Sequence, residues 1–167
     1  ALPIETNDEG KENLFAGRCD VYTTDASGLS STRAAAADPS KWLVLPEIIS
    51  KEPLGPLVRH GDHQWGDVVR WSLNAMIIAE ELGVTSANVD EMTSSNVPEV
   101  LRLLGVEGSY GEMLELAPDW AYQILKQIGN YSESYEANVG PDTPLEIARG
   151  LNALWTQGGI LYAPPFR

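Results

Sequence analysis

The alternation of apolar and polar side chains over residues 19–24 predicts a short strand between two helices. Gly17 is a typical C′ residue for the helix that precedes this strand. Asp25 stands where the strand ends, and the small residues after it make it a typical N-cap for a helix over residues 25–37. A helix, a strand and a second helix in this order favour an α/β fold.

Two further stretches are apolar and rich in strand-forming residues or turns. Residues 42–49 favour extended structure, but Pro46 in their middle is typical of an edge strand or a crossing segment. Residues 51–59 contain Pro53 and Pro56 before an apolar end, and these prolines restrict the path of the backbone.

From Asp62 onward the spacing of apolar residues is mostly helical. It predicts a long helix over residues 63–82 with Asp62 as its N-cap, and the aromatic and methionine stripe of this helix is expected to be core. Further helices are expected over residues 86–104 (two, divided near Pro98), 117–128 and 131–139, and after Thr143 as far as Leu154.

Composition is that of a globular chain with a strong negative charge. Of the 167 residues, 43% are hydrophobic and 21% charged, and no apolar run approaches the ~20 residues of a membrane span. The formal net charge of −13 argues against nucleic acid and anionic membranes as partners. Cys19 is the only cysteine, and its place in the predicted strand indicates a buried thiol; pairing with a cysteine outside the chain stays open.

Asp25 is the strongest candidate for a functional side chain. In open α/β sheets, ligands bind at the carboxyl ends of strands, and Asp25 directly follows a predicted strand. Its carboxylate is suited to an ammonium group, and Thr24 and Thr23 would add hydroxyl groups. The spacing alone leaves open whether Asp25 binds a ligand or only caps its helix.

Other chemistry has weaker support in the sequence. His60, Asp62 and His63 supply two imidazoles and a carboxylate, but their spacing matches no standard zinc motif, so a metal-dependent hydrolase is the weakest alternative. The acidic pairs are expected to form a solvated face. The sequence contains no nucleophile or phosphate-loop motif, so it predicts no enzyme and implies no cofactor.

Four stretches of the chain resemble the periplasmic solute-binding proteins of ABC transporters, and more narrowly their general L-amino-acid-binding subfamily. These stretches are GRCDVYTTDASGL, LPEIISKEPLGPLVRHGDHQW, AEELGVTSANVDEM and IARGLNALWTQGGILYAPPFR. The resemblance runs over essentially the whole chain. Because a complete member of that family is about twice as long, the chain resembles the C-terminal half of one.

The resemblance implies a type II fold, in which two α/β lobes are joined by crossing strands and hold the ligand between them. Residues 1–46 would be the end of the ligand-binding second lobe and the entry to the hinge, and residues 47–167 would be the C-terminal part of the first lobe with helical extensions. The implied function is to bind polar L-amino acids in the periplasm of a Gram-negative bacterium, for uptake by the membrane subunits of an ABC transporter. Asp25 matches the aspartate that holds the ligand's α-ammonium group in this family.

The resemblance also implies a partner for the chain. The family's arginine that clamps the α-carboxylate lies in the earlier half, and Arg33, Arg59 and Arg70 do not match it; they are expected at the surface or packed along their stems. We therefore expect the chain to pair with the missing N-terminal half or with a second copy of itself. A non-binding fragment, or an assembly module that needs a companion half, is the alternative function.

Overall fold

The computed structural model describes residues 3–51 and 53–166, whose regular secondary structure is helical. The N-terminal part, residues 3–41, contains α1 (Asn7–Phe15), α2 (Ala26–Ala34) and the 3-10 turn Pro39–Lys41. The helical body, residues 63–166, begins with α3 (His63–Glu81). Its further helices are α4 (Val89–Met92), α5 (Pro98–Leu103), α6 (Trp120–Gln127) and α7 (Tyr131–Asn138), with 3-10 turns at Glu112–Leu114, Gly150–Asn152 and Trp155–Gln157. None of the helices described is long and apolar enough to cross a bilayer.

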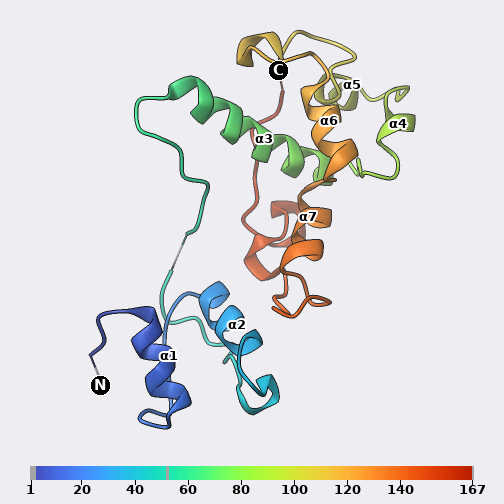
Figure 1. Cartoon of the computed structure of the whole chain (residues 1–167). Helices are drawn as coiled ribbons and strands as arrows, with labels where there is room; N and C mark the ends of the chain where they lie inside the picture. The colour runs from blue at the N-terminus through green and yellow to red at the C-terminus, as the bar shows by residue number, and fades with distance from the viewer. Residues whose placement is uncertain (1–2, 52, 167) are drawn as a thin grey trace.

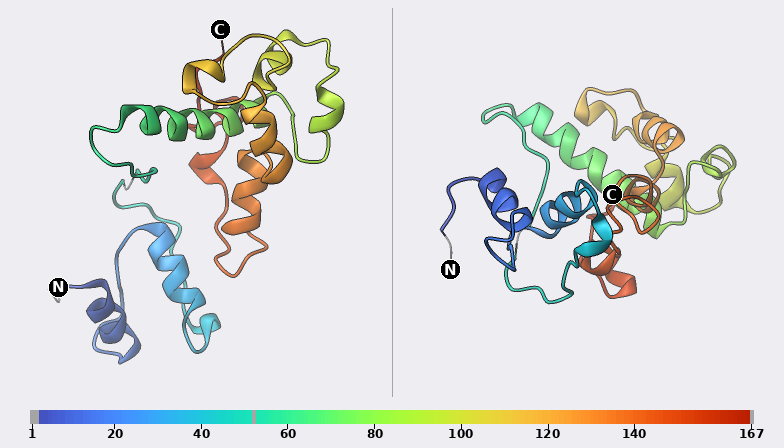
Figure 2. Two further views of the ribbon diagram at one scale, coloured as in Figure 1. Left: turned by 45° about the horizontal axis from the view of Figure 1, so that its top comes forward. Right: turned by 60° about the horizontal axis from the view of Figure 1, so that its bottom comes forward.

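The N-terminal part lies apart from the helical body, as Figure 1 and the left view of Figure 2 show. A connector, residues 42–51 and 53–62, runs between them and contains neither helix nor strand. In the same views, the loop after α7 extends from the helical body toward α2.

The strand predicted over residues 19–24 is wrong for this structure. Residues 42–49 form no edge strand and run as part of the connector between the two parts, which leaves the crossing segment of the two alternatives. The described part of the chain contains no strand, and its one β-bridge joins Leu154 to Leu161. A strand requires a neighbouring backbone for its hydrogen bonds, and both stretches are without such a neighbour. The described residues therefore contain no β-sheet of the predicted α/β fold. Cys19, which was expected to be buried, is partly exposed and has a free thiol.

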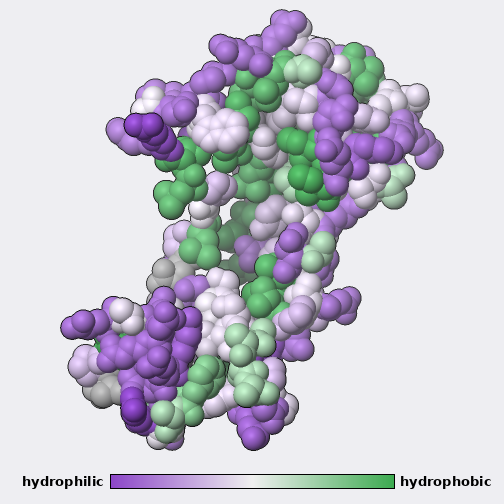
Figure 3. Space-filling model, viewed as in Figure 1, coloured by the Kyte–Doolittle hydropathy of each residue, from purple (hydrophilic) through white to green (hydrophobic). Residues whose placement is uncertain are grey.

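Aliphatic side chains along the connector point into solvent. Ile49 is 81% exposed and Leu57 is 98% exposed, and the same is true in lesser degree of Leu43, Leu45, Ile48 and Leu54. Figure 3 shows hydrophobic surface in the narrow region between the two parts. Because burying each such side chain is worth about 1.5–3 kcal/mol, the connector has the composition of a segment that packs against another surface.

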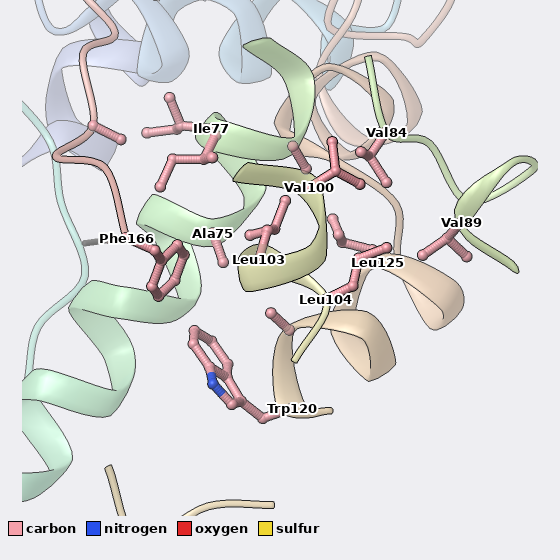
Figure 4. Packing of buried hydrophobic residues seen from close by; sticks show 14 of the residues in the cluster. Ala75, Ile77, Val84, Val89, Val100, Leu103, Leu104, Trp120, Leu125 and Phe166 are labelled. Carbon is pink, nitrogen blue, oxygen red and sulfur yellow. The ribbon is translucent and has the colours of Figure 1, made fainter. Parts of the chain in front are cut away.

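The hydrophobic core lies in the helical body, where α3 packs against α5, α6 and α7. Figure 4 shows side chains of α3, α5 and α6, together with Val84, Val89 and Phe166, packed against one another. The most buried of the large ones are Leu103, Leu125, Val84, Val89 and Val100. Phe166, near the end of the chain, is also buried and lies against the rings of Trp71, Tyr110 and Trp120.

The helix predicted from residue 63 is confirmed with its cap. Asp62 is the N-cap of α3, and its Oδ1 accepts a hydrogen bond of 3.1 Å from the Trp65 N–H. The expectation that the whole aromatic stripe is core is wrong at Trp65, which is 54% exposed, because the first turns of α3 extend beyond the helices that cover its later turns.

The last predicted helix, after Thr143, is also wrong. The backbone instead forms a tight loop in which Glu146 has a φ of 51° and the Ile147 N–H donates to the Val139 carbonyl over 3.0 Å. A left-handed residue interrupts an α-helix, so regular structure resumes only as the 3-10 turn Gly150–Asn152.

Candidate functional site

Asp25 is the N-cap of α2, as the sequence predicts, and its carboxylate is held by three donors. Its Oδ2 accepts hydrogen bonds from the Gly28 N–H at 2.8 Å and the Ser27 hydroxyl at 2.6 Å. The Thr24 hydroxyl donates to Oδ1 at 3.2 Å. Because these donors belong to neighbouring residues, the local backbone at the start of α2 fixes the orientation of the carboxylate.

The same hydrogen bonds lower the pKa of the Asp25 carboxyl below its ordinary value. The Ser27 hydroxyl makes the largest contribution and the Gly28 N–H the next, while partial burial opposes them. Asp25 is therefore a fixed negative charge at neutral pH, at a position that is only partly buried. A fixed carboxylate of this kind is suited to binding a cation such as a primary ammonium group.

Sequence reasoning missed the contributions of Ser27 and Gly28. A Cβ added at Gly28 would lie 3.0 Å from Asp25 Oδ1 and 3.2 Å from Oδ2, so the glycine leaves the room that the carboxylate occupies. The signal for Gly28 was present in the sequence, because an N-cap aspartate accepts a hydrogen bond from the backbone N–H two or three residues further on. Of the two predicted threonines, Thr24 is partly buried and contacts Asp25, whereas Thr23 is exposed.

The arginines differ from one another more than the sequence suggests. Arg70 is largely exposed and pairs with Asp67 of its own helix at 3.5 Å, and Arg59 is exposed, as expected for surface residues. Arg33 has a side chain only 20% exposed, and it contacts the helical body at Glu146.

The histidine-rich segment does not form a metal centre in the part of the chain that the structure describes. No group of three or more metal-ligating side chains occurs among those residues, and Asp62 is engaged as the cap of α3. A hollow of about 360 Å³ lies beside this segment, with Arg59, His60, His63 and Arg70 among its lining residues. It is at the start of α3, in the helical body, whereas Asp25 belongs to the N-terminal part.

Comparison with known proteins gives relatives of one kind. The chain is 54% identical over 165 residues to the glutamate/glutamine/aspartate/asparagine-binding protein BztA of Rhodobacter capsulatus, covering 98% of this chain and 49% of that protein. It is 58% identical over 154 residues to the general L-amino acid-binding periplasmic protein AapJ of Rhizobium johnstonii, covering 91% of this chain and 45% of that protein. No protein-family model matches the chain.

A solved structure agrees with these relatives. An ABC transporter/periplasmic binding protein from Brucella ovis with glutathione bound superposes with a TM-score of 0.91 and is 51% identical, covering 98% of this chain and 52% of that one. The chain is thus a homologue of periplasmic binding proteins of amino-acid ABC transporters, and the resemblance inferred from its sequence is confirmed. It spans about half the length of the relatives it matches.

Proposed function

We propose that this chain is the C-terminal half of a solute-binding protein that captures polar L-amino acids in the periplasm and delivers them to an ABC transporter. The observation that carries the proposal is the identity of 54–58% to amino-acid-binding proteins over nearly the whole chain. The function is binding, not catalysis. The ligand lies between two lobes that close around it.

In this proposal Asp25 binds the α-ammonium group of the amino acid. Its charge is kept by Ser27 and Gly28, which lower the pKa of its carboxyl. Oδ2 already accepts two hydrogen bonds, so Oδ1, with the Thr24 hydroxyl beside it, is the oxygen that receives the ammonium. Thr24 is a first candidate and Thr23 a second for a further hydroxyl contact with the ligand.

The two parts of the chain correspond to the two lobes. Residues 1–46 belong to the lobe that carries Asp25, and residues 47–167 return through the hinge to the other lobe. The separation of α1 and α2 from the helical body, with an extended connector between them, supports this division.

The missing N-terminal half completes the fold and the site. It would supply the strands that pair with residues 19–24 and with the connector, and so cover aliphatic residues such as Ile49 and Leu57. It would also supply the arginine for the α-carboxylate. The solved relative supports this partner, because about half of its chain lies outside the match.

A non-binding assembly module is the second candidate. The exposed aliphatic side chains of the connector favour it as well, because they would bury against any companion chain, a second copy of this one included. The two candidates differ in whether a small ligand binds once the companion is present.

Native mass spectrometry on the chain combined with its companion half, with and without a mixture of L-amino acids, tests the proposal. We expect a one-to-one complex that gains the mass of one amino acid. In the Asp25→Ala complex the binding free energy of the amino acid should become less favourable by about 2–5 kcal/mol, because the ammonium group is left buried without its partner. A complex that takes up no amino acid would favour the module instead.

Asp38 provides a matched control for capping. It also caps a short helical turn, and its Oδ1 accepts hydrogen bonds from the N–H and the hydroxyl of Ser40, two residues on. If Asp25 acts only as a cap, Asp25→Ala and Asp38→Ala will leave amino-acid affinity equally unchanged, and the ligand-binding role of Asp25 is wrong.

A further inference from the structure

One side chain of the N-terminal part reaches the helical body directly. Arg33, in the last turn of α2, donates from one Nη to Glu146 Oε2 at 2.7 Å and to the Leu145 carbonyl at 3.4 Å. Among the described residues, no other hydrogen bond or ion pair joins the two parts. Together with the connector, this contact therefore links the N-terminal part to the helical body.

The loop that receives Arg33 is ordered by its own hydrogen bonds. The Thr143 hydroxyl donates to the Gly140 carbonyl at 2.8 Å, and the Glu146 N–H donates to the Thr143 carbonyl at 3.1 Å. Glu146 adopts the left-handed conformation, with a φ of 51°, which is rare for residues other than glycine. Such strain persists only where surrounding contacts hold it, so the loop presents Glu146 and the Leu145 carbonyl in a fixed geometry.

The contact and the proposed ligand site lie at opposite ends of one short helix. Asp25 caps the start of α2, and Arg33 lies in its last turn. Because α2 is a rigid element of nine residues, fixing its end also fixes the direction in which Asp25 faces. We infer that Arg33 is a positioning residue, whose contact with residues 145–146 holds α2, and with it Asp25, in the orientation that binds the ligand.

The two parts of the chain are arranged as in a ligand-bound relative. The solved relative that carries glutathione superposes on 98% of this chain, both parts included, with a TM-score of 0.91. A contact that is made in the ligand-bound arrangement and lost when the lobes move apart shifts the population toward the bound state. Breaking it lowers affinity without removing any group that touches the ligand.

The inference rests on the proposed function, and its test includes a measurement that needs no ligand. The chain is combined with its companion half, and the binding of L-glutamate and L-glutamine is measured by calorimetry. The variants are Arg33→Ala, Glu146→Gln and the double variant Arg33→Glu with Glu146→Arg, which exchanges the two charges. Because the Glu146 side chain is 60% exposed, water screens the ion pair and we expect each single substitution to weaken binding only about two- to fivefold. The exchanged pair should recover at least half of that loss, which a residue with a purely local role would not do.

The ligand-free measurement follows the orientation of the two parts directly. Dyes on Glu12→Cys in α1 and Glu107→Cys in the helical body, in a Cys19→Ser background, report their separation by energy transfer. We expect Arg33→Ala to broaden the distance distribution and Arg70→Ala to leave it unchanged, since Arg70 pairs within α3.

The possible outcomes separate the two claims. If Asp25→Ala abolishes binding while Arg33→Ala alters neither affinity nor the distance distribution, the positioning role is wrong and the proposed function stands. If Asp25→Ala leaves binding intact, the proposed function is wrong at its ligand contact. Circular dichroism of each variant confirms that the helices are retained.

Discussion

Arg149 donates from one Nη to both carboxylate oxygens of Glu80, at 3.1 Å each. The two side chains are only 16% and 9% exposed, so the ion pair is largely buried. The guanidinium also lies 5.3 Å from the ring centroids of both Tyr131 and Tyr135. Arg149 therefore joins the C-terminal segment to both α3 and α7, although residues 80 and 149 are far apart in the sequence.

Removing Arg149 should be strongly destabilising. Arg149→Ala leaves the Glu80 carboxylate buried without its partner, and we expect the free energy of unfolding to fall by about 3–5 kcal/mol. Arg149→Lys keeps the charge but not the flat, forked geometry, so it should recover only part of the loss. Urea denaturation followed by circular dichroism measures both, with Arg70→Ala as the control for an exposed pair.

Glu133 should make stability depend on acid pH. Burial raises the pKa of the Glu133 carboxyl. Hydrogen bonds from the Ser86 hydroxyl and from the backbone N–H groups of Asn130 and Ser86 lower it by more, so the pKa lies below its ordinary value of 4.5. A lowered pKa in the folded state stabilises the protein above about pH 4.5, and that stabilisation is lost as the pH falls through the lower folded value.

The variant Glu133→Gln tests this dependence. At pH 7 it should cost about 1–3 kcal/mol, because hydrogen bonds to a charged acceptor become bonds to a neutral one. The difference between the wild type and the variant should shrink steadily below pH 4.5, as unfolding curves recorded at several pH values will show. A constant difference over that range would mean that Glu133 acts only through packing.

The helices were predictable from the sequence because their signals are local. Asp25 and Asp62 precede the helices that they cap, and the apolar spacing of residues 63–82 is sufficient to predict α3. The same local reasoning could not decide whether strands form in this chain. Residues 19–24 and 42–49 have the composition of strands, but strand formation depends on a partner backbone, which local sequence does not report.

The candidate site was also predictable from the sequence only in part. Asp25 could be found from its place in the sequence, and its hydrogen bonds to Ser27 and Gly28 are local. The contact between Arg33 and Glu146 could not be found, because it joins residues 113 positions apart and depends on an unexpected loop. Thr143 and Pro144 carry the signals of a helix start, but the left-handed Glu146 interrupts the helix that they would begin.

Ser27→Ala should raise the pKa of the Asp25 carboxyl toward its ordinary value of 3.8, because the Ser27 hydroxyl makes the largest contribution to lowering it. A ¹³C-carboxyl NMR titration of the chain measures the shift directly. Ser31→Ala is the matched control, since the Ser31 hydroxyl donates to the Gly28 carbonyl in the same helix and does not contact Asp25. An unchanged Asp25 pKa in Ser27→Ala would show that the N–H of Gly28 suffices to hold the charge.

Two leucines should separate the stability of the helical body from association with a companion half. Leu125 is fully buried in α6, so Leu125→Ala should lower the free energy of unfolding by about 2–5 kcal/mol, as cavities in packed cores do.

Leu57 is 98% exposed in the connector, so Leu57→Ser should leave the free energy of unfolding of the separate chain within about 0.5 kcal/mol of the wild type. If the companion half covers the connector, the same Leu57→Ser should weaken their association several-fold, as titration of one half with the other would show. An association that tolerates Leu57→Ser and also Ile49→Ser would place the companion on another surface, and the exposed aliphatic residues of the connector would then need a different partner.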